Sequence, residues 1–286
     1  MKIGITGQNG FIGGSVSRAL AEAGYDVIPL DAFTRSFQNE EKDFQDCPKD
    51  LHWVLHFGAK TSIPDSIKSP FETYWNNVGS TITALKIADR CRSSFLFMSS
   101  YVYGHPQYVP IDEMHPVKPM NPYMGSKIIG EDICRQLCSM VNMPLVILRG
   151  FNIFGDHQMP GRLIPDLLEA IRKKVPMVLN DPRPLRDYLY IKDFVSLVMK
   201  ILTRDPIETG TYNIGYGRSY SNLEVAELAY QLSNGKCPLN VLSNPRPSDV
   251  LDCSVDTSLA KRTFSWKPEY SLKRALRELI GNIEDA

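Results

Sequence analysis

The chain has 286 residues, of which 43% are hydrophobic and 22% are charged, with 32 basic and 32 acidic side chains. A chain of this size can bury a substantial core as one large or two modest domains. The balanced charge and the lack of a basic block argue against a nucleic-acid partner. No apolar run approaches the roughly 20 residues that span a bilayer. We find no signal peptide and no Cys-x-x-Cys pair among the six cysteines, so we expect a reducing cytoplasm and no metal site.

A glycine turn lies between the first predicted strand and the first predicted helix. The β-type run Lys2 to Thr6 precedes it, and apolar residues at helical spacing follow it. Glycines there let the backbone approach a pyrophosphate, which the N–H groups and dipole of a helix N-terminus favour. The spacing is Gly-x-x-Gly-x-x-Gly, so it fits the usual dinucleotide pattern only loosely, and a plain strand-to-helix turn is the alternative. The predicted cofactor contacts of this turn are Gly7, Asn9, Gly10, Phe11, Ile12 and Gly13.

Asp31 ends the second predicted strand, about 20 residues past the glycine turn. A carboxylate at this place hydrogen-bonds the adenosine ribose hydroxyls and repels a 2′-phosphate, which favours NAD over NADP. Arg35 follows four residues later and could serve a 2′-phosphate instead. The sequence therefore predicts NAD as cofactor and leaves NADP open.

Tyr123 and Lys127 are four residues apart on a predicted helix, so they share one face. A phenol titrates near ~10 and becomes a base at neutral pH only where a cation favours its anion. Lys127 can be that cation. Ser99 and Ser100 directly follow a predicted strand, and a hydroxyl there can hydrogen-bond a substrate oxygen while Tyr123 exchanges its proton. Ser99, Tyr123 and Lys127 are therefore the predicted catalytic set for hydride transfer.

Strands and helices alternate through the first half of the chain. Buried strands are predicted at 53–57, 95–98 and 145–148, with helices at about 71–90 and 122–141. This order predicts an α/β fold of the Rossmann type, a doubly wound parallel sheet that binds ligands beyond the carboxyl ends of its strands.

The chain resembles the extended short-chain dehydrogenase/reductases, and among them the nucleotide-sugar epimerase and dehydratase group. The resemblance covers nearly the whole chain. Its motifs are Thr6-Gly7-x-x-Gly10-x-x-Gly13, His56-Phe57-Gly58-Ala59, Ser99-Ser100-x-Val102-Tyr103-Gly104, Pro122-Tyr123-x-x-x-Lys127, Leu148-Arg149-Gly150-Phe151-Asn152, Arg186-Asp187-Tyr188, Tyr212-Asn213-Ile214-Gly215, Arg246-Pro247-Ser248-Asp249 and Trp266-Lys267-Pro268.

This resemblance implies roles for further residues. It selects Ser99 as the catalytic hydroxyl, with Ser100 as the fallback. The loop containing Phe57 and Ala59 would pass the pyrophosphate and the nicotinamide, and Asn77 would lie beside the cofactor. Asn152, Arg186 and Arg246 match positions that hold the diphosphate and nucleotide of the substrate. Arginine suits that role because its planar fork binds phosphate oxygens in pairs. For these three, a turn residue or surface ion pairs are the structural alternatives.

The resemblance also implies two domains and a homodimer. Residues 1–152 would bind NAD(P), with a return segment at 187–204, and residues 153–286 would form a small α/β domain for a nucleotide-diphosphate sugar. Ser100 and Tyr101 replace the Asp-Glu pair of 4,6-dehydratases, and Tyr101 stands where 3,5-epimerase-reductases carry cysteine. What remains is a nucleotide-sugar epimerase, acting at C4 through a 4-keto intermediate. The alternatives are an NAD(P)H-dependent reductase of 4-keto-6-deoxy sugars and a non-catalytic dinucleotide sensor.

Overall fold

A computed structural model of the chain describes residues 1–34, 46–245 and 249–284. The chain divides into two compact units, which are described separately below. Unit 1 comprises residues 1–104, 116–150 and 198–212, and unit 2 comprises residues 105–115, 151–197 and 213–286.

Unit 1 is built on a six-stranded sheet with the order β2-β1-β3-β4-β5-β9, and the pairs from β2 to β5 are all parallel. The strands are β1 (Lys2–Thr6), β2 (Asp26–Pro29), β3 (Trp53–His56), β4 (Ser94–Ser100), β5 (Leu145–Gly150) and β9 (Gly210–Ile214). The helices are α1 (Phe11–Glu22), α2 (Asp31–Thr34), α3 (Ile63–Lys68), α4 (Pro70–Cys91) and α5 (Pro122–Met140). The predicted doubly wound α/β sheet is confirmed.

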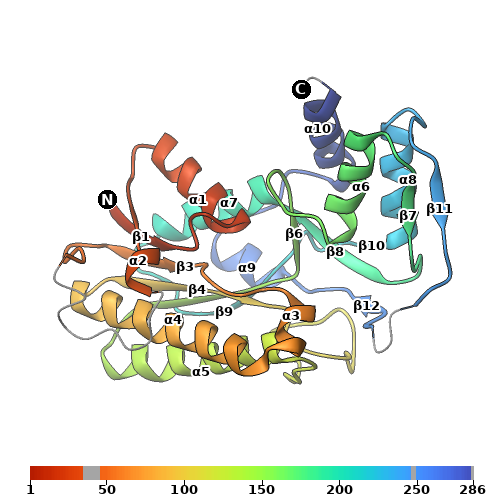
Figure 1. The fold of residues 1–286 in the computed structure, drawn as a ribbon. Helices are drawn as coiled ribbons and strands as arrows, with labels where there is room; N and C mark the ends of the chain where they lie inside the picture. The colour runs from red at the N-terminus through yellow and green to blue at the C-terminus, as the bar shows by residue number, and fades with distance from the viewer. Residues whose placement is uncertain (35–45, 246–248, 285–286) are drawn as a thin grey trace. The chain divides into compact units, whose positions relative to one another are not determined.

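Helices cover both faces of this sheet, with α1 on one face and α4 and α5 on the other (Figure 1). The strands β3, β4 and β5 are buried along almost their whole length and are mostly apolar, as expected for strands covered on both faces. Phe95 and Phe97 of β4 belong to the core that α4 and α5 close with Ala84, Ala88 and Cys134. The strand order reverses between β1 and β3, which makes the carboxyl ends of these two strands the expected place for a ligand.

Unit 2 contains small sheets and the helices that pack on them. Strand β8 (Leu185–Tyr190) pairs with β6 (Asn152–Phe154), β10 (Ser219–Ser221) and β12 (Asp252–Cys253), while β7 (Met177–Leu179) pairs with β11 (Leu239–Val241). The helices are α6 (Leu163–Lys173), α8 (Asn222–Leu232), α9 (Ser258–Thr263) and α10 (Leu272–Glu284). The predicted capping box at the start of α8 is present, because Ser221 and Glu224 each bond the other's backbone N–H.

Helix α7 (Ile191–Leu202) belongs partly to each unit, since unit 1 takes the chain from Val198 onward. The expected return segment, 187–204, therefore begins earlier than the segment that unit 1 contains. Residues 187–190 stay in unit 2 because they lie in β8, whose partners β6, β10 and β12 are all there. Residues 105–115 also join unit 2, where Ile111 forms a β-bridge with Val255.

Candidate active site

The glycine turn after β1 has the backbone geometry that a dinucleotide requires. Gly7 has φ +74°, and a Cβ there would lie 2.7 Å from the amide nitrogen of Gly58. A Cβ on Gly13 would lie 2.2 Å from the carbonyl oxygen of Gly7, so only glycine lets α1 begin this close to the turn. Gly10 is the N-cap of α1 and supplies no side-chain hydrogen bond to it. The N-terminus of α1 thus has no side-chain cap, which fits the binding of a pyrophosphate by its N–H groups.

Asp31 lies at the same turn as the first residue of α2. Its carboxylate accepts hydrogen bonds from the backbone nitrogens of Gly7 at 2.6 Å and Gln8 at 3.2 Å. The carboxylate therefore shapes the turn in addition to the ribose contact that the sequence predicts, and that contact stays a prediction. Arg35, the competing candidate for a 2′-phosphate, lies outside the described residues.

The loop after β3 runs beside the glycine turn. The backbone nitrogen of Phe57 donates to the carbonyl of Thr6, and that of Gly58 donates to the Thr6 hydroxyl at 3.0 Å. Ala59 follows on this loop. Asn77 of α4 lies beneath the loop, 3% exposed, and bonds both backbone groups of Lys60. The loop residues predicted to contact the cofactor thus lie at the predicted end of the sheet.

Tyr123 and Lys127 occupy the first two turns of α5. The helix starts here because Asn121 caps it, accepting from the backbone nitrogen of Met124 at 2.9 Å, and Pro122 takes a position that needs no N–H. Tyr123 is 9% exposed and Lys127 is 3% exposed. The Lys127 ammonium donates to the carbonyl of Met98 at 2.9 Å.

Burial sets the acidity of Lys127. It lowers the pKa of the ammonium to about 8, and the negative charge of Glu131 offsets this only in part. The group therefore carries its positive charge at neutral pH and loses it in mildly alkaline solution. Lys127 lies one helical turn from Tyr123, and a cation close to a phenol favours its anion.

Ser99 and Ser100, at the end of β4, have different surroundings. Ser99 is 2% exposed, and its hydroxyl donates to a carboxylate oxygen of Glu131 at 2.6 Å. Ser100 is partly exposed. The proton of the predicted catalytic hydroxyl thus points at a buried carboxylate of α5.

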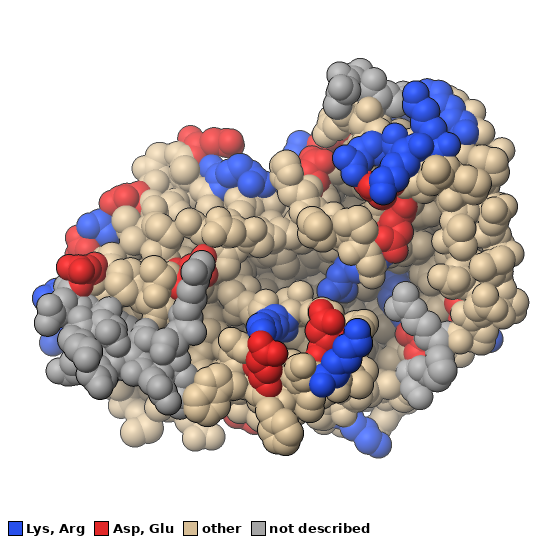
Figure 2. Space-filling model, viewed as in Figure 1, with Lys and Arg blue, Asp and Glu red and all other residues tan. Residues whose placement is uncertain are grey.

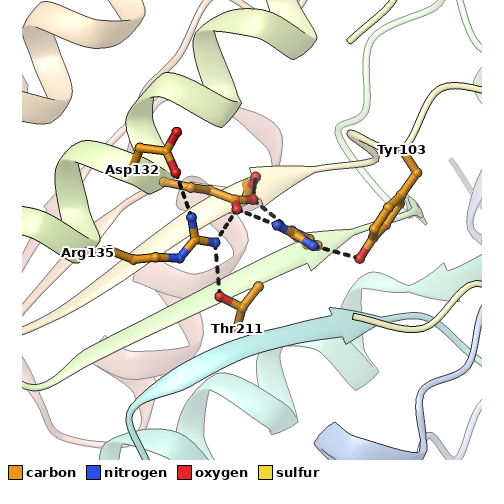
Figure 3. A network of polar contacts seen from close by, with 7 residues as sticks. Tyr103, Asp132, Arg135 and Thr211 are labelled. Carbon is orange, nitrogen blue, oxygen red and sulfur yellow. Dashed lines mark hydrogen bonds and ion pairs between the residues drawn. The ribbon is translucent and has the colours of Figure 1, made fainter. Parts of the chain in front are cut away.

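Glu131 belongs to a network that the sequence analysis did not identify. Its carboxylate receives two hydrogen bonds from the Arg149 guanidinium, at 2.9 and 2.7 Å, and Arg149 also donates to the Tyr103 hydroxyl at 3.0 Å. Arg135 extends the network to Asp132 and Thr211 (Figure 3). Burial opposes the charge of Glu131, but the hydrogen bonds and charge of Arg149 hold the pKa of Glu131 below its ordinary value. An arginine inside a buried strand was the available signal, since such a charge must have a partner.

The predicted substrate residues of unit 2 lie on and around β8. The Asn152 amide donates to the carbonyl of Asp187 at 3.1 Å. Arg186 forms an ion pair with Asp249 at 2.8 Å and donates to the carbonyl of Val250 at 2.6 Å, with its side chain 16% exposed. Its guanidinium is thus held in one orientation by contacts within unit 2. Arg246 lies outside the described residues.

Asp187, the residue after Arg186, binds the backbone of the loop between β9 and β10. Its carboxylate accepts from the backbone nitrogens of Tyr216 at 2.6 Å and Gly217 at 2.7 Å, and burial raises its pKa to about 6. It fixes the loop between β9 and β10. Its side chain was not among the predicted site residues.

In the part of the chain that the structure describes, no group of three or more His, Cys, Asp and Glu side chains is placed to hold a metal ion. None of the helices within those residues has the length and apolar content needed to cross a bilayer. On the face seen in Figure 2, acidic and basic side chains are interspersed, and basic ones gather where α10 and α6 are drawn.

Comparison with known proteins gives a consistent result. Residues 3–215 match the model of the NAD dependent epimerase/dehydratase family. UDP-glucose 4-epimerase of Mus musculus is 29% identical over 97% of this chain and 95% of its own length. Two solved structures share the fold with a TM-score of 0.89. UDP-glucose 4-epimerase of Thermotoga maritima with UDP-glucose is 22% identical and covers 100% of this chain and 99% of its own. RMD of Pseudomonas aeruginosa complexed with NADPH is 23% identical and covers 99% of both chains.

Proposed function

The chain belongs to the NAD dependent epimerase/dehydratase family, and we propose that it is a nucleotide-sugar 4-epimerase working through a 4-keto intermediate. It is an enzyme that uses NAD, as its family does. The observation that carries the proposal is the placement of Tyr123 and Lys127 on successive turns of α5, beside β4 in the unit that holds the glycine turn. The mouse UDP-glucose 4-epimerase, similar along nearly its whole length, supports the same reaction.

In this proposal the protein supplies proton transfer and orientation. The cofactor NAD, held at the glycine turn, would supply reversible hydride transfer at a sugar carbon. Tyr123 takes the proton of the adjoining hydroxyl and gives it back, as a general base and then a general acid. The positive charge of Lys127 lowers the free energy of the Tyr123 phenolate. The ammonium itself is buried and is oriented by its hydrogen bond to the carbonyl of Met98 on β4.

Ser99 is the proposed hydroxyl partner of the reacting oxygen. Because its proton is donated to Glu131, its oxygen accepts a hydrogen bond from a substrate hydroxyl without any rearrangement. Ser100 remains the alternative, since it is the more exposed of the pair. Replacing each serine singly by alanine separates the two, because only the serine that contacts the substrate lowers kcat strongly.

Arg186, Asn152 and Arg246 are the proposed contacts for the substrate diphosphate and nucleotide. The ion pair of Arg186 with Asp249 orients the guanidinium before a substrate arrives. A diphosphate would then bind the face of the fork that Asp249 leaves accessible, which charge-assisted hydrogen bonds make favourable.

A reductase of nucleotide-linked 4-keto-6-deoxy sugars is the second candidate. The segment between β6, which ends at Phe154, and α6, which begins at Leu163, is brief. A short substrate domain suits such a reductase, which would draw on NADH or NADPH.

The proposal also includes a homodimer formed through α4 and α5. These helices carry large apolar side chains that are open to solvent in the single chain, with Phe71 88%, Trp75 59%, Ile129 41% and Met140 78% exposed. Large exposed apolar side chains on neighbouring helices are typical of protein–protein contact surfaces. Sedimentation of the wild type should give a dimer, and Trp75→Asp should give a monomer.

The decisive experiment for the reaction is incubation of the purified protein with UDP-, dTDP-, GDP- and CDP-sugars, with and without added NADH. An epimerase yields a product of unchanged mass without added cofactor, and NMR identifies the inverted carbon. A gain of two hydrogens that depends on NADH or NADPH would establish the reductase instead.

A further inference from the structure

Five buried polar side chains form a hydrogen-bonded chain beneath the cofactor loops of unit 1. They are exposed by no more than 3%, lie on β1, β3, α4 and α5, and include none of the three predicted catalytic residues; they are Thr6, His56, Asn77, Thr81 and Ser126. Buried polar groups are stable only where their hydrogen bonds are made, so each bond in this chain constrains the next.

The bonds fix the tautomer of His56. The Thr81 hydroxyl donates to the carbonyl of Asn77 at 2.8 Å, so its oxygen is left to accept from Nε2 of His56 at 3.0 Å. His56 therefore carries its proton on Nε2, and its Nδ1 accepts from the Thr6 hydroxyl at 2.7 Å. The Thr6 oxygen in turn accepts from the backbone nitrogen of Gly58. Burial lowers the pKa of His56 to about 3, so the ring stays neutral.

Both the oxygen and the nitrogen of the Asn77 side-chain amide make hydrogen bonds within the protein. Its oxygen accepts from the backbone nitrogen of Lys60 at 2.7 Å, and its nitrogen donates to the carbonyl of Lys60 at 3.0 Å and to the Ser126 hydroxyl at 2.9 Å. Ser126 then donates to the carbonyl of Tyr123 at 2.7 Å. Both N–H donors of Asn77 are committed to the protein, so a bond donated to a cofactor would require breaking one of them.

We propose that His56 and Asn77 are positioning residues, which hold the loop at 58–60 at a fixed separation from the glycine turn and from the first turn of α5. His56 acts through Thr6 on Gly58, and Asn77 acts through Ser126 on Tyr123. The sequence predicts that Asn77 contacts the cofactor, whereas the bonds above let it act through the loop and the helix. The part that concerns Tyr123 rests on the proposed function, whereas the part that concerns the loop needs only NAD binding.

Two threonines of α4 give a matched test of the loop. Thr81 and Thr83 are both buried and both donate to the carbonyl four residues earlier, but only Thr81 accepts from His56. Thr81→Val should raise the Kd for NAD about tenfold, because it leaves the His56 Nε2–H without an acceptor. Thr83→Val should leave that Kd unchanged, and Thr81→Ser should restore it. The Kd is measured by calorimetry without any nucleotide sugar, and circular dichroism checks the fold.

Ser126→Ala tests the hydrogen bonds that connect Asn77 to Tyr123. This test is independent of whether the Thr81 variants fold. It should lower kcat about tenfold and leave the KM for the nucleotide sugar near the wild-type value, as expected for a misplaced Tyr123. Asn77→Ala should impair both NAD binding and kcat. The inference would be overturned if Thr81→Val kept the wild-type NAD affinity, Ser126→Ala kept the wild-type kcat and only Asn77→Ala bound NAD more weakly. That result would show that Asn77 is a direct cofactor ligand. A wild type that binds NAD and converts no nucleotide sugar would refute the proposed function. The inference that His56 and Asn77 position the loop at 58–60 would still stand.

Discussion

Replacing Lys127 by methionine should stabilise the folded protein while it abolishes turnover. Burial lowers the pKa of this ammonium from 10.5 to about 8. Since each pKa unit corresponds to ~1.4 kcal/mol, keeping the charge buried at neutral pH costs about 3 kcal/mol. Methionine fills a similar volume without a charge, but it loses the hydrogen bond to the carbonyl of Met98, which contributes about 1 kcal/mol. The expected net gain is about 2 kcal/mol.

The pH dependence of this gain identifies its cause. The pKa of Lys127 is lower in the folded protein, so between pH 8 and 10.5 the unfolded chain binds the proton and the folded chain does not. The stability of the wild type relative to the variant therefore rises with pH in that window. The advantage of Lys127→Met should be constant below about pH 7 and should shrink as the pH rises through the window. Above about pH 10.5 the wild type should be the more stable protein by about 1 kcal/mol, the contribution of the hydrogen bond to Met98.

Urea denaturation of the cofactor-free proteins at a series of pH values measures the difference directly. Lys127→Met should have the higher free energy of unfolding at pH 7, with no detectable turnover. A variant that is less stable than the wild type at pH 7, or a difference that does not change between pH 7 and 10.5, would refute the assigned cost of burying the ammonium.

Three further substitutions test the site. Tyr123→Phe should lower turnover by at least ~10²-fold and leave NAD affinity near the wild-type value, because it removes only the proton-transfer group; wild-type rates would exclude Tyr123 as the acid and base. Asp31→Ala should weaken NAD binding and narrow the gap between NAD and NADP in titrations, since it removes a carboxylate that also accepts from Gly7 and Gln8; a wild type that prefers NADP would contradict the predicted ribose contact. Arg186→Ala should weaken binding of a nucleoside diphosphate by about 1.5–3 kcal/mol, with Arg186→Lys intermediate and NAD binding unaffected; equal affinities for wild type and Arg186→Ala would leave Arg186 as a partner of Asp249 only.

The parallel sheet could be predicted because its central strands are mostly apolar and its helices begin at residues with local signals. Trp53–His56 and Leu145–Gly150 are buried throughout, and Asn121-Pro122 marks the start of α5. Which unit contains residues 187–190 could not be predicted in this way. The pairing of β8 with strands far away in the sequence decides where these residues lie.

The side-chain partners in the site were the least accessible to sequence reasoning. Lys127 follows Tyr123 by four positions, and helix geometry is enough to place them on one face. The bonds of Ser99 to Glu131 and of Asn77 to Lys60 and Ser126 join segments that only the folded chain brings together. Sequence position alone therefore predicted Ser99 and Asn77 as site residues, but it predicted neither their partners nor the hydrogen bonds that they make.

The proposed 4-epimerase reaction is tested most directly by a nucleotide sugar that carries deuterium at C4. The protein should convert it to the C4 epimer with the deuterium still at C4, without consuming added cofactor, because the same bound NAD removes and returns the label. Loss of the deuterium to water, or product formation only with stoichiometric NADH or NADPH, would contradict the proposed reaction.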